Sequence, residues 1–481
     1  MIWKENPLRS LNSEPRAALL LTSLFLKILG SAFSAITLIV RSPALGVASA
    51  IICLVWFGLL FLSALPRTDR LSHGPREWLA RSAKVSLVAL ILAGVGELVI
   101  IISFSLGAFK GATANVESLA ASLQRVGACS DAMALEHQAT DNFLAGKNPY
   151  EEANVITAGI ECDVPSDKMT PLRTGQFATD APYPDLGKLE RVYADARANP
   201  SVVPPEFESK YNYPAASFML PAPLVALGID DLRIVFLVYL VPILGYVVWR
   251  LRSSRLRVYF LLGLAASLEV WNSLFSGGTG LLIFPLLLLA WLFYRKNLWL
   301  SALFMGLAIA TKQIAWFLVP FYLILILREK GLTKALVASA VAGGVFLAFN
   351  LPYIVGNPGL WFSSVVAPMT DPLFPSNTLI IVFNYVGLIN LGSSLPYTVV
   401  EVGVFIAALA WYFFNCRRYP DTALVLAVVP FFFAWRGSWG YYFYFDIILL
   451  AAILLESHEL SGNQPIPALA TGQAPEKERA A

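Results

Sequence analysis

The segment that begins at Asp131 holds residue types that can carry acid–base chemistry. Glu136 and Asp141 follow Asp131 at short intervals, and the segment closes with Gly-Lys-Asn-Pro-Tyr, which ends at Tyr150. We expect a short helix with acids at its start and along it. A carboxylate can accept the proton of a hydroxyl group, so Asp131 is a candidate general base. Asp131 also has a structural interpretation, as the residue that caps the helix, and one aspartate can fill both roles.

Apolar runs on both sides of this segment indicate a membrane. Hydrophobic residues make up 57% of the 481 residues and charged residues only 14%, and runs near the length of a bilayer span recur along the chain. The sequence therefore predicts an all-α polytopic membrane protein. It holds no nucleotide-binding glycine loop, no Cys and His metal-ligand spacing and no internal repeat, and nothing in it indicates a nucleic acid partner.

The apolar runs predict about twelve transmembrane helices. Several have fewer than the ~20 residues that an untilted span needs, so polar neighbours must extend them or they end in a protein-lined space. The expected spans are 17–40, 43–65, 85–108, 233–249, 258–272, 279–294, 298–311, 314–327, 335–354, 397–414, 422–434 and 441–455.

Lysines and arginines cluster at alternate connections between these spans. The positive-inside rule makes those connections cytoplasmic, which places both termini in the cytoplasm and residues 109–213, 273–278 and 355–396 outside. This count treats residues 213–227, which include three prolines, as a helix at the outer interface and not as a crossing. The six clusters are Lys4, Arg9 and Arg16; Arg67, Arg70, Arg76, Arg81 and Lys84; Arg250, Arg252, Arg255 and Arg257; Arg295 and Lys296; Arg328, Lys330 and Lys334; and Arg417 and Arg418.

The outward segment 109–213 is too long for a simple connector, and its mixture of prolines, aromatic residues and charges predicts a folded extracytoplasmic domain. It contains Cys129 and Cys162, whereas the other two cysteines lie in or at the end of apolar spans. An extracytoplasmic compartment favours a disulfide between Cys129 and Cys162, and unlinked thiols are the alternative. Residues 457–481 are rich in Ala, Pro, Gly and charge, and we expect them to form a disordered cytoplasmic tail.

Polar residues inside or beside the spans need a partner or a use. Lys27 and Glu97 have similar expected depths in the membrane and can pair across a helix interface, although Lys27 can also snorkel and Glu97 can bond a hydroxyl group. The other candidates lie at separate outward turns, where a structural role stays open because helix ends are normally polar. They are Glu269 and Asn272, Lys312 and Gln313, and Arg436, Trp439, Tyr442 and Asp446.

The order of several short motifs resembles a known family. An acid, a helix and Gly-x-Asn-Pro-Tyr are followed by Tyr213-Pro214, by a lone lysine in Ala310-Thr311-Lys312-Gln313 and by Trp-x-x-Tyr at 439–442. This pattern is similar to that of the polyprenyl-phosphate-sugar-dependent glycosyltransferases of the GT-C fold. It is most similar to glycosyltransferase family 87, a mannosyltransferase-like group.

The resemblance covers residues 82–456 and leaves residues 1–81 as a cytoplasmic N-terminus with two additional spans. The chain also departs from the family pattern. Ala215 stands where the family often has a second proline, residues 276–279 replace a Gly-Gln-x-Asn turn, and Gly440-Tyr441 stands where a histidine is common. These departures concern the particular sugar and acceptor more than the fold.

The resemblance implies an inverting transfer of a mannose-like sugar from polyprenyl phosphate to a lipid or glycan acceptor, on the extracytoplasmic side of a bacterial plasma membrane. Asp131 is then the expected base, and Lys312 and Arg436 are expected to bind the donor phosphate. The residues expected to contact the sugar or the acceptor are Glu269, Asn272, Gln313, Tyr150, Tyr213, Trp439 and Tyr442. No cofactor is implied beyond the lipid-linked donor; a divalent metal, the identity of the acceptor and the oligomeric state stay open.

Two other classes of function are compatible with the sequence. A transporter or flippase also uses polar residues in short helices, although transporters usually carry internal repeats and bind substrate near the midplane of the membrane. A lipid-linked glycan ligase has a similar outer loop with an Arg/His site, and His137 is the only histidine that the expected topology places outside.

Overall fold

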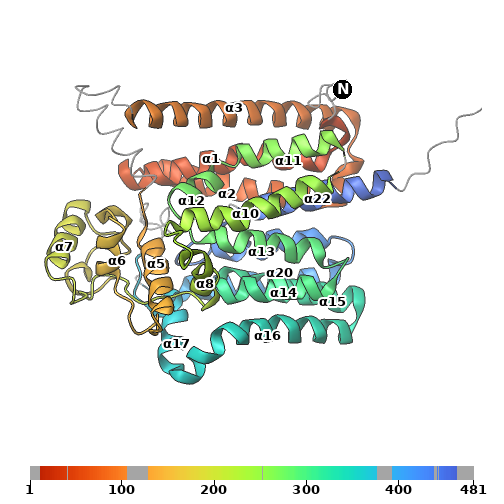
Figure 1. Ribbon diagram of the computed structural model, residues 1–481. Coiled ribbons are helices and arrows are strands. Elements are labelled where there is room, and N and C mark those ends of the chain that lie inside the picture. The colour runs from red at the N-terminus through yellow and green to blue at the C-terminus, as the bar shows by residue number, and fades with distance from the viewer. Residues whose placement is uncertain are drawn as a thin grey trace, which may run out of the picture.

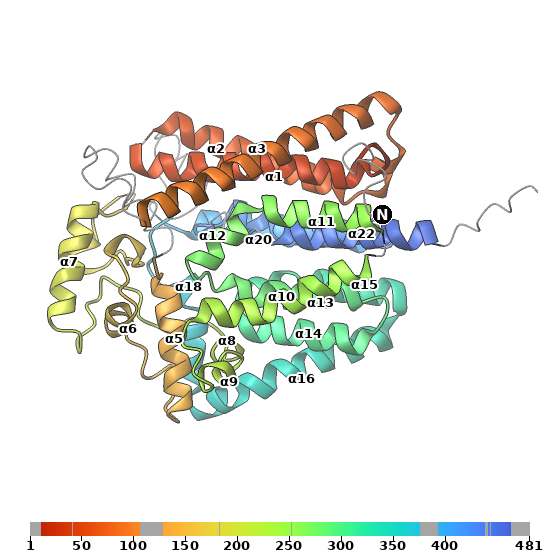
Figure 2. The ribbon, with the colours of Figure 1, turned by 45° about the horizontal axis from the view of Figure 1, so that its top comes forward.

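The computed structural model describes residues 11–40, 42–105, 128–181, 183–251, 253–375, 393–437, 441–442 and 444–462. Every regular element in this part of the chain is a helix, and most of the long helices lie side by side in one bundle (Figures 1 and 2). One end of the bundle carries α5 (Asp131–Leu144), α6 (Val155–Glu161) and α7 (Leu186–Ala198), and we call it the loop end. We call the opposite end the basic end.

The chain begins with three long apolar helices. They are α1 (Pro15–Val40), α2 (Pro43–Ser63) and α3 (His73–Ser105), with the short 3-10 helix η2 (Pro66–Arg70) between α2 and α3. Ser42 stands at the N-cap position of α2 and Pro43 follows at its first turn, where the missing proline N–H leaves no intrahelical bond unmade. Helix α3 begins twelve residues before the expected span at 85–108, so several of the basic residues of that connection lie on the helix itself.

The described residues 128–213 contribute most of a second hydrophobic core at the loop end. Polar side chains cap the helices of this segment: Ser130 caps α5, Asn154 caps α6 and Asp185 caps α7, each accepting backbone N–H groups of the first turn. Two 3-10 helices, η3 (Ser166–Lys168) and η4 (Gly175–Phe177), connect them. The core includes Val155, Ile156, Phe177, Leu189, Phe207 and Tyr211, together with Val365 and Phe374 from later in the chain.

Residues 213–227 do not form one long helix. The structure gives two single-turn helices there, α8 (Ala216–Met219) and α9 (Ala222–Val225), with Pro221 between them. A segment this short cannot cross a bilayer, which needs ~20 helical residues. The segment runs from the domain at the loop end into the next long helix.

The remaining helices complete the bundle. In chain order they are α10 (Leu232–Arg250), α11 (Ser254–Ala266), α12 (Leu268–Phe275), α13 (Gly280–Phe293), α14 (Leu298–Thr311), η5 (Gln313–Phe317), α15 (Val319–Lys330), α16 (Leu332–Gly356), α17 (Pro358–Val365), α18 (Ala367–Thr370), α20 (Leu395–Asn415), η6 (Pro420–Thr422), α21 (Ala423–Leu426), η7 (Val429–Phe432) and α22 (Phe445–Gly462). Helix α22 extends into the expected tail, and residues 463–481 lie outside the described residues.

Within the described residues, six helices are long and apolar enough to cross a membrane: α1, α2, α3, α10, α16 and α20. The pair α11 and α12, bent by 53° at its break, makes a seventh if it is one span. Helices α13 and α14 have only 14 residues each, which is about 21 Å at ~1.5 Å per residue, against a hydrocarbon core of ~30 Å. The helices are those of a polytopic membrane protein, and the count of twelve spans stays a prediction.

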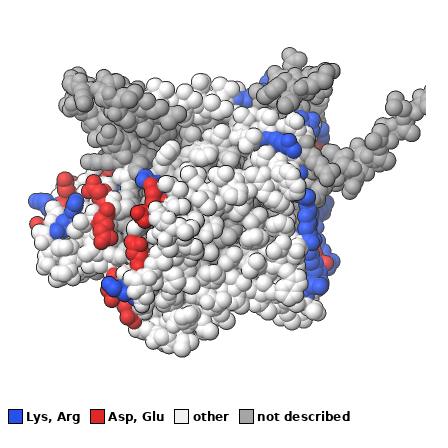
Figure 3. All heavy atoms as spheres, viewed as in Figure 1, with Lys and Arg blue, Asp and Glu red and all other residues white. Residues whose placement is uncertain are grey.

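Charge is distributed unevenly along the bundle. Figure 3 shows acidic residues gathered over the domain at the loop end, lysines and arginines gathered at the basic end, and an almost uncharged belt between them. Large apolar side chains such as Val85 on α3, Val355 on α16 and Ile406 on α20 are exposed on the surface. An exposed apolar belt between two charged ends is what a bilayer requires of the surface that it covers.

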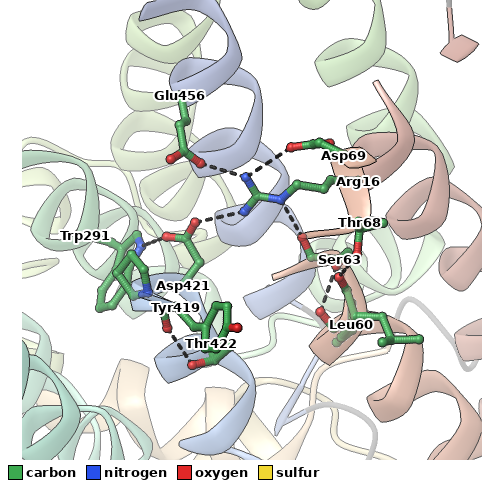
Figure 4. Close-up of polar contacts among 12 residues, drawn as sticks. Arg16, Leu60, Ser63, Thr68, Asp69, Trp291, Tyr419, Asp421, Thr422 and Glu456 are labelled. Atoms are coloured by element: carbon green, nitrogen blue, oxygen red, sulfur yellow. Dashed lines mark hydrogen bonds and ion pairs between the residues drawn. The ribbon is translucent and has the colours of Figure 1, made fainter. Parts of the chain in front are cut away.

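A buried ion cluster joins the first helix to the last one near the basic end (Figure 4). Arg16, which is only 3% exposed, donates hydrogen bonds to Glu456 at 2.7 Å, to Asp421 at 3.2 Å and to the backbone carbonyl of Ser63 at 2.8 Å. The indole N–H of Trp291 on α13 donates a second hydrogen bond to Asp421, at 3.1 Å. The cluster therefore ties α1 and α2 to η6, α13 and α22.

Candidate functional site

Asp131 occupies the first turn of α5 but is not its cap. Ser130 is the N-cap residue, and its hydroxyl oxygen accepts the backbone N–H of Met133. The carboxylate of Asp131 instead accepts the N–H of Ala132 through Oδ1 and the N–H of Thr170 through Oδ2, both at 2.7 Å. The capping interpretation of Asp131 is therefore wrong, and its structural role is to attach the segment around Thr170 to the start of α5.

The surroundings of Asp131 include a cation and a tyrosine. Burial raises the pKa of Asp131, while the hydrogen bonds from Thr170 and Ala132 and the charge of Arg436 oppose that shift. Tyr183 senses the same charges: burial raises its pKa to about 12, Arg436 lowers it and Asp131 raises it. These three residues thus form one electrostatic group. In the sequence, Tyr183 follows Asp131 by 52 residues and Arg436 follows Tyr183 by 253 residues.

A second group is centred on Lys312. This residue is the C-cap of α14. Its backbone is extended, with φ −156° and ψ 142°, so the helix ends there. Its Nζ donates a hydrogen bond to Oγ1 of Thr279 and lies 4.6 Å from the centroid of the Tyr213 ring. A cation over the face of an aromatic ring is attracted by the ring quadrupole, which helps to fix the ammonium group in position.

Glu136 on α5 belongs to the Lys312 group. Its side chain is 1% exposed, and neither carboxylate oxygen has a hydrogen-bond partner in the described part of the chain. Burial raises the pKa of Glu136 to about 8, and the charge of Lys312 opposes this shift. Burial therefore favours the neutral carboxyl group, whereas the nearby charge of Lys312 favours the carboxylate.

The turn between α12 and α13 holds the two groups close together. Gly277 has a positive φ of 68°, and a Cβ atom there would lie 1.6 Å from Sδ of Met133 on α5. Only glycine permits both this conformation and this close approach. The turn therefore brings Thr279 to Lys312 while it packs directly on the helix that carries Asp131 and Glu136.

Three of the expected sugar or acceptor ligands form a network at the same place. The hydroxyl of Tyr150 donates a 2.9 Å hydrogen bond to the carbonyl of Tyr213. The amide of Gln313 donates to the carbonyls of Asn212 and Val365, the latter at 2.7 Å. Tyr150 and Gln313 thereby fix the backbone beneath the Tyr213 ring, which in turn faces Lys312. In the structure Tyr150 and Gln313 therefore act as positioning residues for the backbone around Tyr213.

Glu269 has a different environment from the one expected. Its carboxylate lies 3.8 Å from Nζ of Lys27, and the same Nζ lies 2.5 Å from Asp446. Lys27 is fully buried, so α1, α12 and α22 meet at an ionic triad inside the bundle. The side chain of Glu97, the partner expected for Lys27, lies outside the described residues.

The other expected site residues are dispersed. Asn272 lies on α12 just before the turn, where its backbone carbonyl accepts the N–H of Ser276. Tyr442 packs inside the bundle against the rings of Trp56 and Phe57, with centroid distances of 5.9 and 5.3 Å. Trp439 lies outside the described residues.

Sequence reasoning missed several residues that the structure brings to the site. Glu136 was visible as an acid on the helix, but nothing local indicates its burial. Thr279 and Tyr183 have no signal of their own. Asn350 on α16 accepts the N–H of Ala215 at 2.9 Å and the indole N–H of Trp361 at 3.2 Å, and an asparagine inside a long apolar run was the signal for it.

A disulfide joins Cys129 to Cys162, whose Cα atoms are 6.1 Å apart. It links the residue before the cap of α5 to the C-cap residue of α6, and so restrains the start of the helix that carries Asp131. Within the described ranges, no group of three or more His, Cys, Asp and Glu side chains is arranged to hold a metal ion.

No family of known proteins, no curated protein and no solved structure matches this chain.

Proposed function

We propose that the protein is an inverting glycosyltransferase of the GT-C type, which moves a mannose-like sugar from polyprenyl phosphate to a lipid or glycan acceptor. The observation that carries this proposal is the cation of Lys312 held at the end of a membrane helix, beside the domain that carries Asp131. An enzyme that uses a lipid-linked donor needs this combination, because the lipid tail stays in the bilayer while the phosphate and sugar reach its surface.

Lys312 has the role of binding the donor phosphate. Its ammonium group is fixed by Thr279 and Tyr213, and the burial of Glu136 disfavours the carboxylate that would neutralise this charge. The positive charge stabilises the negative charge that grows on the phosphate as the bond to the sugar breaks. Arg436 supplies a second positive charge, whose field acts on Asp131.

Asp131 has the role of the general base. The acceptor oxygen attacks the anomeric carbon from the face opposite the phosphate, its proton passes to Asp131, and the carbon–oxygen bond to the phosphate breaks with both electrons leaving on the phosphate. Inversion at the anomeric carbon follows from this geometry. The raised pKa of Asp131 makes it a stronger proton acceptor than an exposed aspartate.

The charge distribution supports the sidedness of the proposal. Lysines and arginines gather at the basic end, so the positive-inside rule assigns that end to the cytoplasm and the loop end to the extracytoplasmic side (Figure 3). We accordingly propose a multi-pass protein of a bacterial plasma membrane with an extracytoplasmic site. The short helices α13, α14 and α15, the segment from η6 to η7 and helix α22 then bring the count to the twelve spans of the proposed GT-C architecture.

A flippase for a lipid-linked sugar is the second candidate. The buried triad of Lys27, Glu269 and Asp446 favours it, because ionisable residues inside a membrane bundle often serve transport.

One assay distinguishes the two candidates. The purified protein is reconstituted in liposomes with polyprenyl-phosphate mannose that is radiolabelled in the sugar, together with a lipid extract as acceptor. A glycosyltransferase releases free polyprenyl phosphate and labels an acceptor. A flippase moves the donor between leaflets and leaves its sugar–phosphate bond intact, and that result would overturn the proposal.

A further inference from the structure

A pocket of about 380 Å³ lies at the start of α14, the end of α15 and the start of α16. These helix ends are at the basic end, away from α5 (Figure 1). The pocket lies between the turn that joins α13 to α14 and the turn that joins α15 to α16. Its lining residues are Lys296, Asn297, Leu298, Trp299, Lys330, Lys334 and Val337. The volume is within the range of ~300–1,000 Å³ that is typical of pockets for small ligands.

The polar side of the pocket carries a concentration of positive charge. Three of the seven lining residues are lysines, and none is an acid. Lys330 is held in place because its Nζ donates to the backbone carbonyls of Tyr294 and Arg295. The neighbouring acid, Glu329, lies 3.8 Å from Arg295 in an ion pair. Three ammonium groups around one pocket raise its positive potential, which favours the binding of an anion.

The helix ends at the pocket add to this positive potential. Both α14 and α16 begin there, and neither has an acid in its first turn. Gly331, at the N-cap position of α16, has no side chain to accept the first N–H groups of the helix. Lys334 in the first turn of α16 adds a full positive charge to the positive end of the helix dipole, an arrangement that is unfavourable without an anion.

The other side of the pocket is apolar and continues onto the surface of the bundle. Leu298 and Val337 line it, Trp299 at its edge is 65% exposed, and the nearby Leu332 is 63% exposed. Exposed tryptophan is typical of the membrane–water interface. A ligand that fills this pocket therefore has an anionic part and an apolar part.

We propose that this pocket binds the headgroup of an anionic phospholipid at the cytoplasmic surface of the membrane. The phosphodiester lies among Lys296, Lys330 and Lys334, and the glycerol and the first part of the acyl chains lie along Trp299 and the apolar side. A free phosphate ion has the same charge chemistry but uses only the polar side. The proposal is independent of the proposed glycosyl transfer, because the pocket lies at the opposite end of the bundle.

Native mass spectrometry of the full-length protein in detergent tests this inference, with dioleoyl phosphatidylglycerol as the probe. Dioleoyl phosphatidylcholine serves as the zwitterionic comparison and inorganic phosphate as the free-anion comparison. The test variant is Lys296→Gln/Lys334→Gln, which leaves the backbone contacts of Lys330 intact. The matched control is Arg81→Gln/Lys84→Gln on α3. It removes the same amount of positive charge from another basic cluster, away from the pocket.

We expect phosphatidylglycerol to bind more tightly than phosphatidylcholine. Each lysine near an anionic surface contributes about 1 kcal/mol, so the double variant should bind phosphatidylglycerol about tenfold to thirtyfold more weakly than the wild type and the control. Equal weakening in both double variants would mean non-specific attraction and would overturn the proposal. Equal binding of both lipids, or displacement of phosphatidylglycerol by millimolar phosphate, would also overturn it.

Discussion

At the scale of single residues, the neighbours of Lys312 support the donor-binding role that we propose for it. It stands where an apolar helix ends, and Thr279 and Tyr213, from two other segments, fix its ammonium group. A lysine at such a place in the sequence could equally have pointed into solvent. The contacts with Thr279 and Tyr213 favour the binding role over that alternative.

Replacement of Lys312 by glutamine should weaken binding of the lipid-linked donor. Hydrogen bonds to charged groups are worth ~1.5–3 kcal/mol, so the dissociation constant should rise about tenfold to more than a hundredfold. Equilibrium binding of polyprenyl-phosphate mannose measures this. Lys147→Gln, which removes an exposed charge from the same end, is the control. The double variant Lys312→Gln/Glu136→Gln should bind equally weakly, and recovery of binding in it would contradict the role of Lys312.

Glu136 should make the stability of the protein depend on pH. Its pKa is raised from 4.5 to about 8 in the folded state, so the folded protein holds a proton that the unfolded chain releases between these values. The folded state then loses stability as the pH rises from about 4.5 to about 8.

In Glu136→Gln this contribution is absent, so its melting temperature should change less over that range and exceed that of the wild type at pH 8. Asp141→Asn, whose wild-type side chain is about half exposed, should follow the wild-type curve. Identical pH dependence of Glu136→Gln and the wild type would show that Glu136 is ionised in the folded protein throughout.

At the scale of helices, the Arg16 cluster joins the first two helices to the rest of the bundle. The sequence resemblance treats residues 1–81 as an addition to the core. In the structure Arg16 contacts Glu456 on α22, Asp421 on η6 and the end of α2, and Lys27 on the same helix contacts Asp446 and Glu269. Buried charges therefore join α1 to α12, η6 and α22.

Arg16→Gln should destabilise the protein strongly. It leaves Asp421 and Glu456 without the cation, and removal of one partner from a buried ion pair typically costs ~3–5 kcal/mol. The melting temperature in detergent should fall by several degrees or more. Arg81→Gln removes an exposed ion pair with Glu77 and should change stability by ~1 kcal/mol or less. A similar small change in both variants would contradict a stabilising role for the Arg16 cluster.

The sequence predicts elements better than it predicts their contacts. Apolar runs were sufficient to locate α1, α2, α10, α16 and α20, because the helix period and the bilayer length are local properties of the chain. The partner of Lys27 was not predictable, since Asp446 lies 419 residues away. Met133, on the same helix as the buried Glu136, packs against Gly277, which is a tertiary contact that no local pattern reveals.

At the scale of the whole molecule, the two charged ends and the apolar belt define how the bundle lies in a membrane. The acidic domain and the basic end have opposite charge, and the exposed apolar side chains lie between them (Figure 3). In the orientation that we propose from the basic clusters, the candidate site lies on the extracytoplasmic side.

Labelling of single cysteines in intact cells tests that orientation. Cysteines introduced at exposed positions such as Glu190 and Arg191 on α7 should react with a membrane-impermeant thiol reagent, whereas cysteines at Arg70 and Gly74 should react only after the cells are opened. The native disulfide protects Cys129 and Cys162, and the two free cysteines, Cys53 and Cys416, are buried. The reverse pattern of labelling would place the candidate site in the cytoplasm, where the proposed reaction does not occur.

The most direct test of the proposed function is the rate of sugar transfer by Asp131→Asn. General-base catalysis typically contributes ~10²–10⁴-fold, so the variant should lose that factor in the rate of transfer from polyprenyl-phosphate mannose while donor binding stays nearly unchanged. Loss of the acceptor for the Thr170 N–H also costs about 1–3 kcal/mol of stability, so a melting curve must show that the variant is folded. Asp141→Asn, further along the same helix, should transfer sugar at the wild-type rate. A folded Asp131→Asn protein that transfers sugar at the wild-type rate would contradict the role of Asp131 and the mechanism built on it.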